Sequence, residues 1–150
     1  MEQAPETRPA EDASRALEVS EIRALLRELG WGTLATVRDG EPYGVPVGYA
    51  LGGDCVYIAS GLGRKLSNLE RDPAVCLTVC AVQTFDVWRS VVIEGRAEEV
   101  TGLRARAVAI AAFVGQKSPR GGINVTDARR MLGARLFRLS LEGAAGRARG

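Results

Sequence analysis

Aliphatic positions near the start of the patterned sequence follow the period of a helix. They recur at spacings of three and four residues, and they are Ile22, Leu25, Leu26 and Leu29. This spacing places them on one face of an amphipathic α-helix. Ser20 suits the N-cap, and Gly30 suits the position just after the last turn. We therefore predict a helix that starts at Ser20 and ends before Gly30.

Later segments have the composition of β-strands. Apolar and polar residues alternate in the first of them, and β-forming residues predominate in the others. The six segments are about 33–38, 43–51, 55–60, 75–82, 88–100 and 134–143. Asp39-Gly40 is typical of a tight hairpin turn between the first two. Pro42 and Pro46 indicate that the second strand is irregular or lies at a sheet edge.

Two further segments have helical features. A glycine-containing turn leads into a short helix that carries Leu66 and Leu69 and ends at Asp72-Pro73. A second amphipathic helix begins after Thr101. Its apolar face is predicted to hold Leu103, Ala107, Ile110, Ala111 and Val114.

The chain is predicted to form one domain between two short tails. Residues 1–16 are rich in Glu, Ala and Pro, which favours a flexible acidic tail. Residues 17–143 form the domain, with a polar glycine-rich loop at 115–125 and a short helix at 126–132. Residues 144–150 are expected to be a flexible basic tail. Because strands and helices do not alternate as in βαβ units, we predict a mainly β (α+β) fold, a small antiparallel barrel with peripheral helices.

The amino-acid composition limits the types of catalysis, metal site and partner that the chain can support. The 150 residues include no histidine, which excludes His-based acid–base catalysis, Ser–His and Cys–His nucleophile pairs, and metal sites built on histidine. We predict no metal site. Twenty cationic and 18 anionic side chains give a net charge of +2, which is too small to indicate a nucleic-acid partner. Apolar runs are too short for a membrane span, so no membrane partner is expected.

The cysteines indicate the redox environment. There are three of them, and an odd number without a signal peptide is typical of reduced thiols in the cytoplasm, where we expect the protein to be located. Cys76 and Cys80 lie four residues apart in an apolar strand. We interpret both as small buried hydrophobic residues rather than as a ligand pair or redox pair.

Residues 61–65, Gly-Leu-Gly-Arg-Lys, have the features of an anion-binding turn. Arg64 and Lys65 fall at the start of the predicted short helix, where cations oppose the helix dipole. A bound anion would reverse this effect, because free backbone N–H groups, the dipole and both cations would face it. The spacing matches neither of the common nucleotide-binding loops. A solvated basic helix start remains the alternative.

Three segments carry a resemblance to a known family. Residues 42–49, 57–79 and 88–100 resemble the flavin-binding split barrels related to pyridoxamine 5′-phosphate oxidase. The similarity covers about residues 20–142 and is greatest to the branch that includes nitroimidazole reductase proteins. It implies a six-stranded antiparallel split β-barrel with peripheral helices, and a homodimer with the flavin sites at the subunit interface.

The resemblance also implies which residues contact the cofactor. They are Val45, Pro46, Val47, Gly48, Ile58, Ala59, Ser60, Arg64, Lys65 and Ser90. The first four match a strand that follows the flavin ring and ribityl chain, and the next three continue that contact. The Arg-Lys pair matches the site of the FMN phosphate, in agreement with the anion argument. Ser90 matches a position whose side chain reaches the flavin.

The sequence departs from the resemblance at one point. Many nitroimidazole-reductase-like sequences have a histidine just before the Arg-Lys turn, where this chain has Ile58-Ala59-Ser60. We therefore assign no catalytic side chain and do not predict pyridoxamine phosphate oxidation. The expected function is FMN-dependent reduction of a small electron-poor acceptor, with a reduced nicotinamide as donor. The alternatives are a deazaflavin-dependent reductase on the same fold and a non-catalytic flavin-binding or sensing module. Haem is disfavoured by the lack of histidine.

Overall fold

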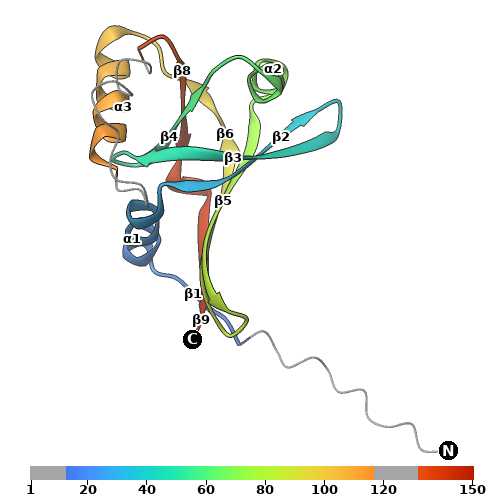
Figure 1. The fold of residues 1–150 in the computed structure, drawn as a ribbon, viewed down its shortest axis with the longest axis vertical. Coiled ribbons are helices and arrows are strands. Elements are labelled where there is room, and N and C mark those ends of the chain that lie inside the picture. Colours follow the sequence, from blue (N-terminus) through green and yellow to red (C-terminus); the bar gives the residue numbers. More distant parts are fainter. Residues whose placement is uncertain (1–12, 117–131) are drawn as a thin grey trace, which may run out of the picture.

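The computed structural model of the protein describes residues 13–116 and 132–150. Strands of this part form one antiparallel sheet in the order β1-β9-β6-β5-β2-β3-β4-β8-β7. The strands are β1 (Arg15–Ala16), β2 (Trp31–Arg38), β3 (Glu41–Leu51), β4 (Cys55–Ser60), β5 (Ala74–Thr84), β6 (Val87–Arg96), β7 (Glu98–Glu99), β8 (Arg135–Ser140) and β9 (Ala144–Arg149). The helices are α1 (Val19–Leu29), α2 (Arg64–Arg71) and α3 (Leu103–Gly115). Figure 1 shows a curled sheet with α1 and α3 on one side and α2 near the β2–β3 hairpin.

This architecture confirms the predicted fold class, and each of the six predicted strands is present. The described residues add β9 and the two-residue strands β1 and β7. Asp39-Gly40 joins β2 to β3, as the turn signal predicts. The proline-containing part of β3 is an edge, because residues 41–48 pair with β2 alone, whereas the pairing with β4 is confined to residues 49–51. The helix predicted at 126–132 lies almost wholly outside the described residues.

The C-terminal segment differs from the expected flexible tail. Residues 144–149 form β9, which pairs with β6 and with the short strand β1. Small residues make this possible, since a Cβ at Gly146 would come within 2.9 Å of side-chain atoms of Leu17 and Ile22. Ala148 is buried, and the Arg147 guanidinium binds the Ser14 carbonyl oxygen at 2.7 Å. The segment has no aliphatic pattern, so its strand conformation depends on neighbours far away in sequence.

Helix α1 ends where the sequence predicts. Gly30 has φ 75°, the left-handed conformation that stops a helix. The helix begins one residue before Ser20, next to a reciprocal contact in which the Glu18 amide donates to the Glu21 carboxylate at 2.8 Å. The hydroxyl of the buried Tyr49 donates to the Leu26 carbonyl oxygen at 2.7 Å and accepts from the Gly30 amide at 3.1 Å. Tyr49 therefore joins the end of α1 to β3.

Ionisation of Tyr49 should limit stability at alkaline pH. Burial raises the pKa of Tyr49 from 10.0 to about 12. The neutral phenol is thus favoured in the folded protein, and the free energy of unfolding should fall as pH rises from about 10 to about 12, by about 2–3 kcal/mol. Tyr49→Phe should lose stability at neutral pH, by about 1–3 kcal/mol, and should lack this alkaline decline. Urea unfolding of both proteins across this pH range tests the prediction. If the free energy of unfolding falls with pH equally in the wild type and in Tyr49→Phe, the prediction is wrong.

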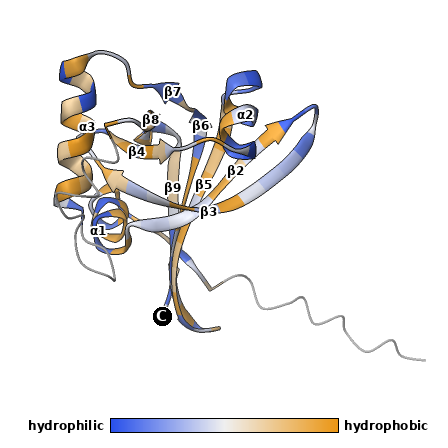
Figure 2. Ribbon diagram, turned by 45° about the horizontal axis from the view of Figure 1, so that its top comes forward, coloured by the Kyte–Doolittle hydropathy of each residue, from blue (hydrophilic) through white to orange (hydrophobic). Residues whose placement is uncertain are grey.

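Helix α3 is present, but of the five residues predicted for its apolar face only Ile110 packs against the core, where it is partly buried. Leu103 is 92% exposed, and Ala107, Ala111 and Val114 are also exposed, whereas Ala109 and Phe113 are buried. The buried pair packs with residues of β3, β4 and β8 in a separate small core, made of Ala50, Cys55, Tyr57, Val100, Ala109, Phe113 and Leu136. In Figure 2 most of the α3 ribbon has the colours of hydrophobic residues. Its pattern alone could not select the face that packs.

The interpretation of Cys76 and Cys80 as buried residues is also wrong. Cys76 is only partly buried and Cys80 is exposed. Both point away from the core, because the core side of β5 is occupied by Val75, Leu77 and Val79. In the described part of the chain, no helix is both long and apolar enough to cross a membrane.

Candidate functional site

The end of β4 and the start of α2 form a cationic turn. Ser60 is buried, and its hydroxyl donates to the Gly61 carbonyl oxygen at 3.0 Å. Gly63 has φ 146°, a conformation that favours glycine, and it caps α2 without a side-chain hydrogen bond. The first turn of α2 has no acidic residue. The leading N–H groups of such a helix point outward without intrahelical partners, so they can bind an anion.

Arg64 and Lys65 add two cations to this turn. The Arg64 guanidinium lies 4.4 Å from the centroid of the Tyr43 ring on β3, a cation–π contact. Lys65 is half-buried, and desolvation lowers the pKa of its ammonium group. Within residues 13–116 and 132–150, neither cation forms an ion pair with a carboxylate. A partly desolvated ammonium group without a carboxylate partner favours an anionic ligand.

The open edge of β3 lies beside this turn. Along residues 41–48 one side of the strand pairs with β2, and the other side has no strand partner among the described residues. Val45 and Val47 face the interior, while Pro46 and Gly48 lie opposite Thr33 and Trp31 on the other face. Backbone donors and acceptors on this edge are therefore open to a ligand.

Most of the predicted site residues meet in this region. β3 and β4 are neighbours in the sheet, α2 follows β4, and Arg64 stacks on a residue of β3. In β4, Ile58 and Ser60 are buried and Ala59 is half-buried. Of the ten predicted positions, nine lie on these three adjoining elements, including Arg64 and Lys65, which the anion argument also indicates.

Ser90 is the exception. It lies on β6, opposite Cys80 on β5 and Arg147 on β9. Two strands, β5 and β2, separate β6 from β3. Three strand spacings correspond to about 14 Å, so one chain does not bring Ser90 to the open edge of β3.

Ser90 belongs to a sheet surface that faces away from the core, here named the outer sheet face. It comprises Trp31, Thr33, Ala35, Gly44, Pro46, Gly48, Cys76, Thr78, Cys80, Val82, Trp88, Ser90 and Val92. These side chains are small or apolar, and the charged residues Glu94 and Arg147, which pair with Cys76 and Ser90, border them on the same face. Trp31 is 52% exposed and Val82 67% exposed. A partly exposed apolar centre with a charged border is typical of a contact with another protein surface.

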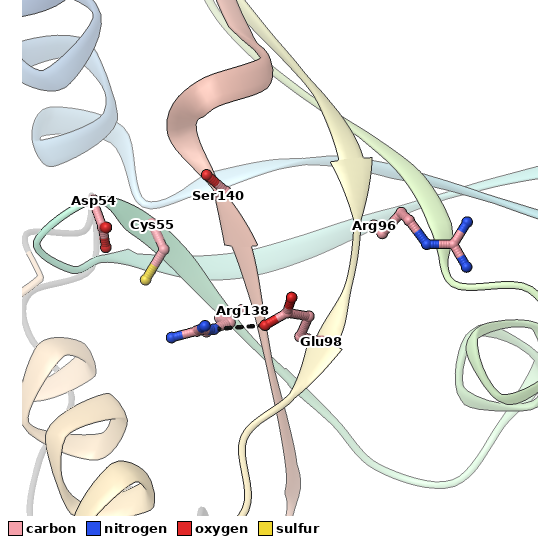
Figure 3. A pocket seen from close by; sticks show the side chains of 6 residues that line it. All are labelled: Asp54, Cys55, Arg96, Glu98, Arg138 and Ser140. Atoms are coloured by element: carbon pink, nitrogen blue, oxygen red, sulfur yellow. Dashed lines mark hydrogen bonds and ion pairs between the residues drawn. The ribbon is translucent and has the colours of Figure 1, made fainter.

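A cavity of about 110 Å³ lies elsewhere, between β4, β7 and β8 (Figure 3). It is lined by Asp54, Cys55, Arg96, Glu98, Arg138 and Ser140. The Arg138 guanidinium binds the Glu98 carboxylate at 3.0 Å, and burial raises the pKa of the Cys55 thiol. None of the predicted cofactor-binding residues lines it. Because Arg138 is paired with a carboxylate and the Cys55 thiol is protonated, this cavity is less suited to binding an anionic ligand than the cationic turn is.

A second cavity, of about 130 Å³, includes Trp88 and Arg89. Arg89 pairs with Glu28 at 3.4 Å, and Arg149, which also lines the cavity, pairs with Asp86 at 2.9 Å. These arginines already have carboxylate partners, so they attract a further anion less strongly than Arg64 and Lys65 do.

Some features of the site were not evident from the sequence. As tyrosines on a predicted strand, Tyr43 and Tyr49 are both expected to be core or interface residues, yet the Tyr43 ring lies against Arg64. Tyr49 is a core residue as expected, and its hydroxyl, the strongest candidate among the tyrosines as a donor to a substrate, is engaged at the end of α1. Asn68 carries no sequence signal, yet it is fully buried beneath the turn. These contacts join segments that are distant in sequence.

Comparison with known proteins gives a family match and several similar folds. A family model described as pyridoxamine 5′-phosphate oxidase matches residues 18–148. Among curated proteins, an uncharacterized protein of Rhizobium meliloti is 31% identical over 86 residues. That match covers 57% of this chain and 57% of the relative, so it spans little more than half of each protein.

Solved structures extend the comparison over nearly the whole chain. An FAD-binding protein from Mesorhizobium loti is 27% identical with a TM-score of 0.71, and the alignment covers 91% of this chain and 97% of that one. A proposed 5-nitroimidazole antibiotic resistance protein from Bacteroides thetaiotaomicron is 16% identical with a TM-score of 0.73, over 90% and 87%. An FAD and heme binding protein from Mycobacterium smegmatis is 18% identical with a TM-score of 0.71, over 92% and 74%. The last two share the fold alone.

Proposed function

This chain belongs to the pyridoxamine 5′-phosphate oxidase family, and we propose that it is an FMN-binding flavoprotein that acts as an oxidoreductase. The observation that carries this proposal is the turn at α2, where Lys65 is half-buried without an ion-pair partner among the described residues. A phosphate monoester fits this turn, because it carries enough charge to engage both cations and the open N–H groups.

Each predicted position takes a role in this proposal. Arg64 and Lys65 hold the phosphate, and the open edge of β3 with the end of β4 offers backbone groups to the ribityl chain and ring. Flavin supplies the redox chemistry when bound, and the chain supplies orientation, electrostatics and exclusion of water. This division suits a chain that lacks histidine. The proposed reaction passes a hydride from a reduced nicotinamide to a small electron-poor acceptor.

The separation of Ser90 from the other positions supports a homodimer. The outer sheet face holds Ser90 together with exposed apolar residues such as Trp31 and Val82. We propose that two copies pack through this face, so that Ser90 of one copy completes the site formed by the open β3 edge of the other. The cofactor then lies at the interface, as the family resemblance implies.

Tyr43 should contribute to phosphate affinity by fixing Arg64. Tyr43→Ala removes the ring 4.4 Å from the guanidinium, and we expect FMN affinity to fall about threefold to tenfold, which corresponds to a cation–π contact of about 0.7–1.4 kcal/mol. Tyr43→Phe keeps the ring and should bind like the wild type. Fluorescence titration with FMN measures both; equal losses in the two variants would contradict the role of the ring.

FMN affinity should also depend on pH through Lys65. Desolvation lowers the pKa of this lysine, and only the ammonium form attracts the phosphate. We therefore expect FMN affinity to decline with rising pH below the ordinary lysine range, while riboflavin affinity stays constant. Titrations of both flavins over a pH series measure this. If riboflavin affinity declines with pH in the same way, the contact between Lys65 and the phosphate does not cause the decline.

Titration with competing cofactors tests the proposal and its alternatives. FMN, FAD and a deazaflavin phosphate are each added to the apoprotein, and FMN is expected to bind most tightly. Preferential binding of the deazaflavin would favour the deazaflavin-dependent reductase, and preferential binding of FAD would assign the cofactor named for the Mesorhizobium loti structure. If FMN binds but reduced nicotinamide reduces it no faster than free FMN, the protein is a binding or sensing module.

A further inference from the structure

A buried amide lies beneath the cationic turn. Asn68 on α2 has no exposed surface, and its Nδ2 donates to the Thr36 hydroxyl on β2 at 3.0 Å. Its Oδ1 is also buried and has no hydrogen-bond partner among the residues that the structure describes. An unsatisfied buried carbonyl oxygen costs stability, and a leucine of similar size would avoid that cost. Packing alone therefore does not explain why this position holds the amide of Asn68.

The contact from Asn68 leads back to the cations. Thr36 is 2% exposed and lies directly opposite Tyr43 in the β2–β3 ladder. Its hydroxyl makes a longer contact, 3.5 Å, to the Tyr43 carbonyl oxygen. The Tyr43 ring in turn lies against the Arg64 guanidinium, one helical turn before Asn68. The four residues form a closed path from α2 through two strands and back to α2.

We propose that Asn68 is a positioning residue for the cofactor's phosphate. Through Thr36 it fixes α2 against the part of β2 that pairs with Tyr43, and so holds the Tyr43 ring and the Arg64 guanidinium in register. The inference rests on the proposed binding of FMN at this turn. It adds that phosphate affinity depends on a polar contact buried beneath the helix.

The path predicts opposite changes in stability and affinity. Asn68→Leu fills the same space without a buried carbonyl oxygen, so the melting temperature should be unchanged or higher. The register of Arg64 is then less fixed, and the FMN dissociation constant should rise about threefold to tenfold, comparable to the loss of the ring contact. The dissociation constant of riboflavin, which has no phosphate, should stay the same. Substitution of a purely structural residue would change the dissociation constants of FMN and riboflavin by the same factor.

The experiment compares FMN and riboflavin titrations for the wild type, Asn68→Leu, Thr36→Val and the double variant. Thr36→Val keeps the shape of the side chain and removes the hydroxyl, and it should give the same FMN-specific loss. The double variant should be no weaker than either single variant, because both substitutions break one path. Thr36→Ser restores a hydroxyl and should recover FMN affinity.

Gln116→Leu is the matched control. Gln116 is another buried amide, whose Nε2 donates to the carbonyl oxygens of Leu26 and Arg27 at the far end of α1. Its substitution should lower the melting temperature and leave the ratio of FMN to riboflavin affinity unchanged.

The outcomes separate this inference from the proposed function. Wild-type protein that does not prefer FMN over riboflavin contradicts the phosphate site itself. A wild-type preference that persists in full in Asn68→Leu and Thr36→Val overturns only the inference. If Asn68→Leu does not fold, Thr36→Val decides. If neither folds, the pair is structural and the inference is wrong.

Discussion

Replacement of both Arg64 and Lys65 with alanine is expected to weaken FMN binding by about a hundredfold or more. Each cation is proposed to make a charge-assisted hydrogen bond to the phosphate, and such bonds contribute about 1.5–3 kcal/mol each. The melting temperature of the apoprotein should barely change, because neither side chain has a carboxylate partner in the described part of the chain. Loss of the Arg64 contact with Tyr43 costs about 1 kcal/mol.

Titration with FMN and riboflavin measures this effect. Riboflavin should bind the double variant nearly as well as it binds the wild type. Arg27→Ala with Arg104→Ala removes the same charge from exposed positions on α1 and α3, and this control should retain FMN affinity. A loss of less than tenfold in the Arg64/Lys65 variant would mean that the phosphate lies elsewhere.

Thr78→Arg is expected to separate the proposed dimer and to weaken cofactor binding with it. Thr78 lies near the centre of the outer sheet face, opposite Thr33 on β2 and Val92 on β6. An arginine there would place like charges from two copies against each other in a desolvated contact, which is strongly unfavourable. The core side of β5 is unchanged, so each subunit should still fold. Ser90 of the partner copy would no longer reach the site.

Light scattering during size-exclusion chromatography, followed by FMN titration, tests this second prediction. The wild type should elute as a dimer, and Thr78→Arg as a monomer with lower FMN affinity. Thr101→Arg places the same side chain at an exposed position outside this face and should remain dimeric. A wild-type monomer that binds FMN with full affinity would show that the site needs no second copy.

The elements that the sequence predicted correctly are those whose signals are local. Gly30 marks the end of α1 because a left-handed residue stops a helix and glycine adopts that conformation most easily. The alternation in β2 and the Asp39-Gly40 turn define a hairpin without help from the rest of the fold. For the same reason the Gly-Leu-Gly-Arg-Lys turn leads into α2 as expected.

The errors concern elements that depend on tertiary contacts. β9 has the sequence Ala-Ala-Gly-Arg-Ala-Arg, and its strand conformation depends on pairing with β6 and on the close approach of Gly146 to Leu17 and Ile22. Helix α3 is apolar on most sides, so the position of β4 and β8 selects Phe113 for burial. The path from Asn68 to Arg64 crosses two strands, and no spacing along the chain reveals it.

The visible spectrum of the purified protein, with mass analysis of any released cofactor, tests the central claim most directly. The account predicts flavin absorption bands and FMN in the released material, or uptake of added FMN at micromolar concentration. A protein that contains no bound flavin and takes up no FMN at that concentration would contradict this claim.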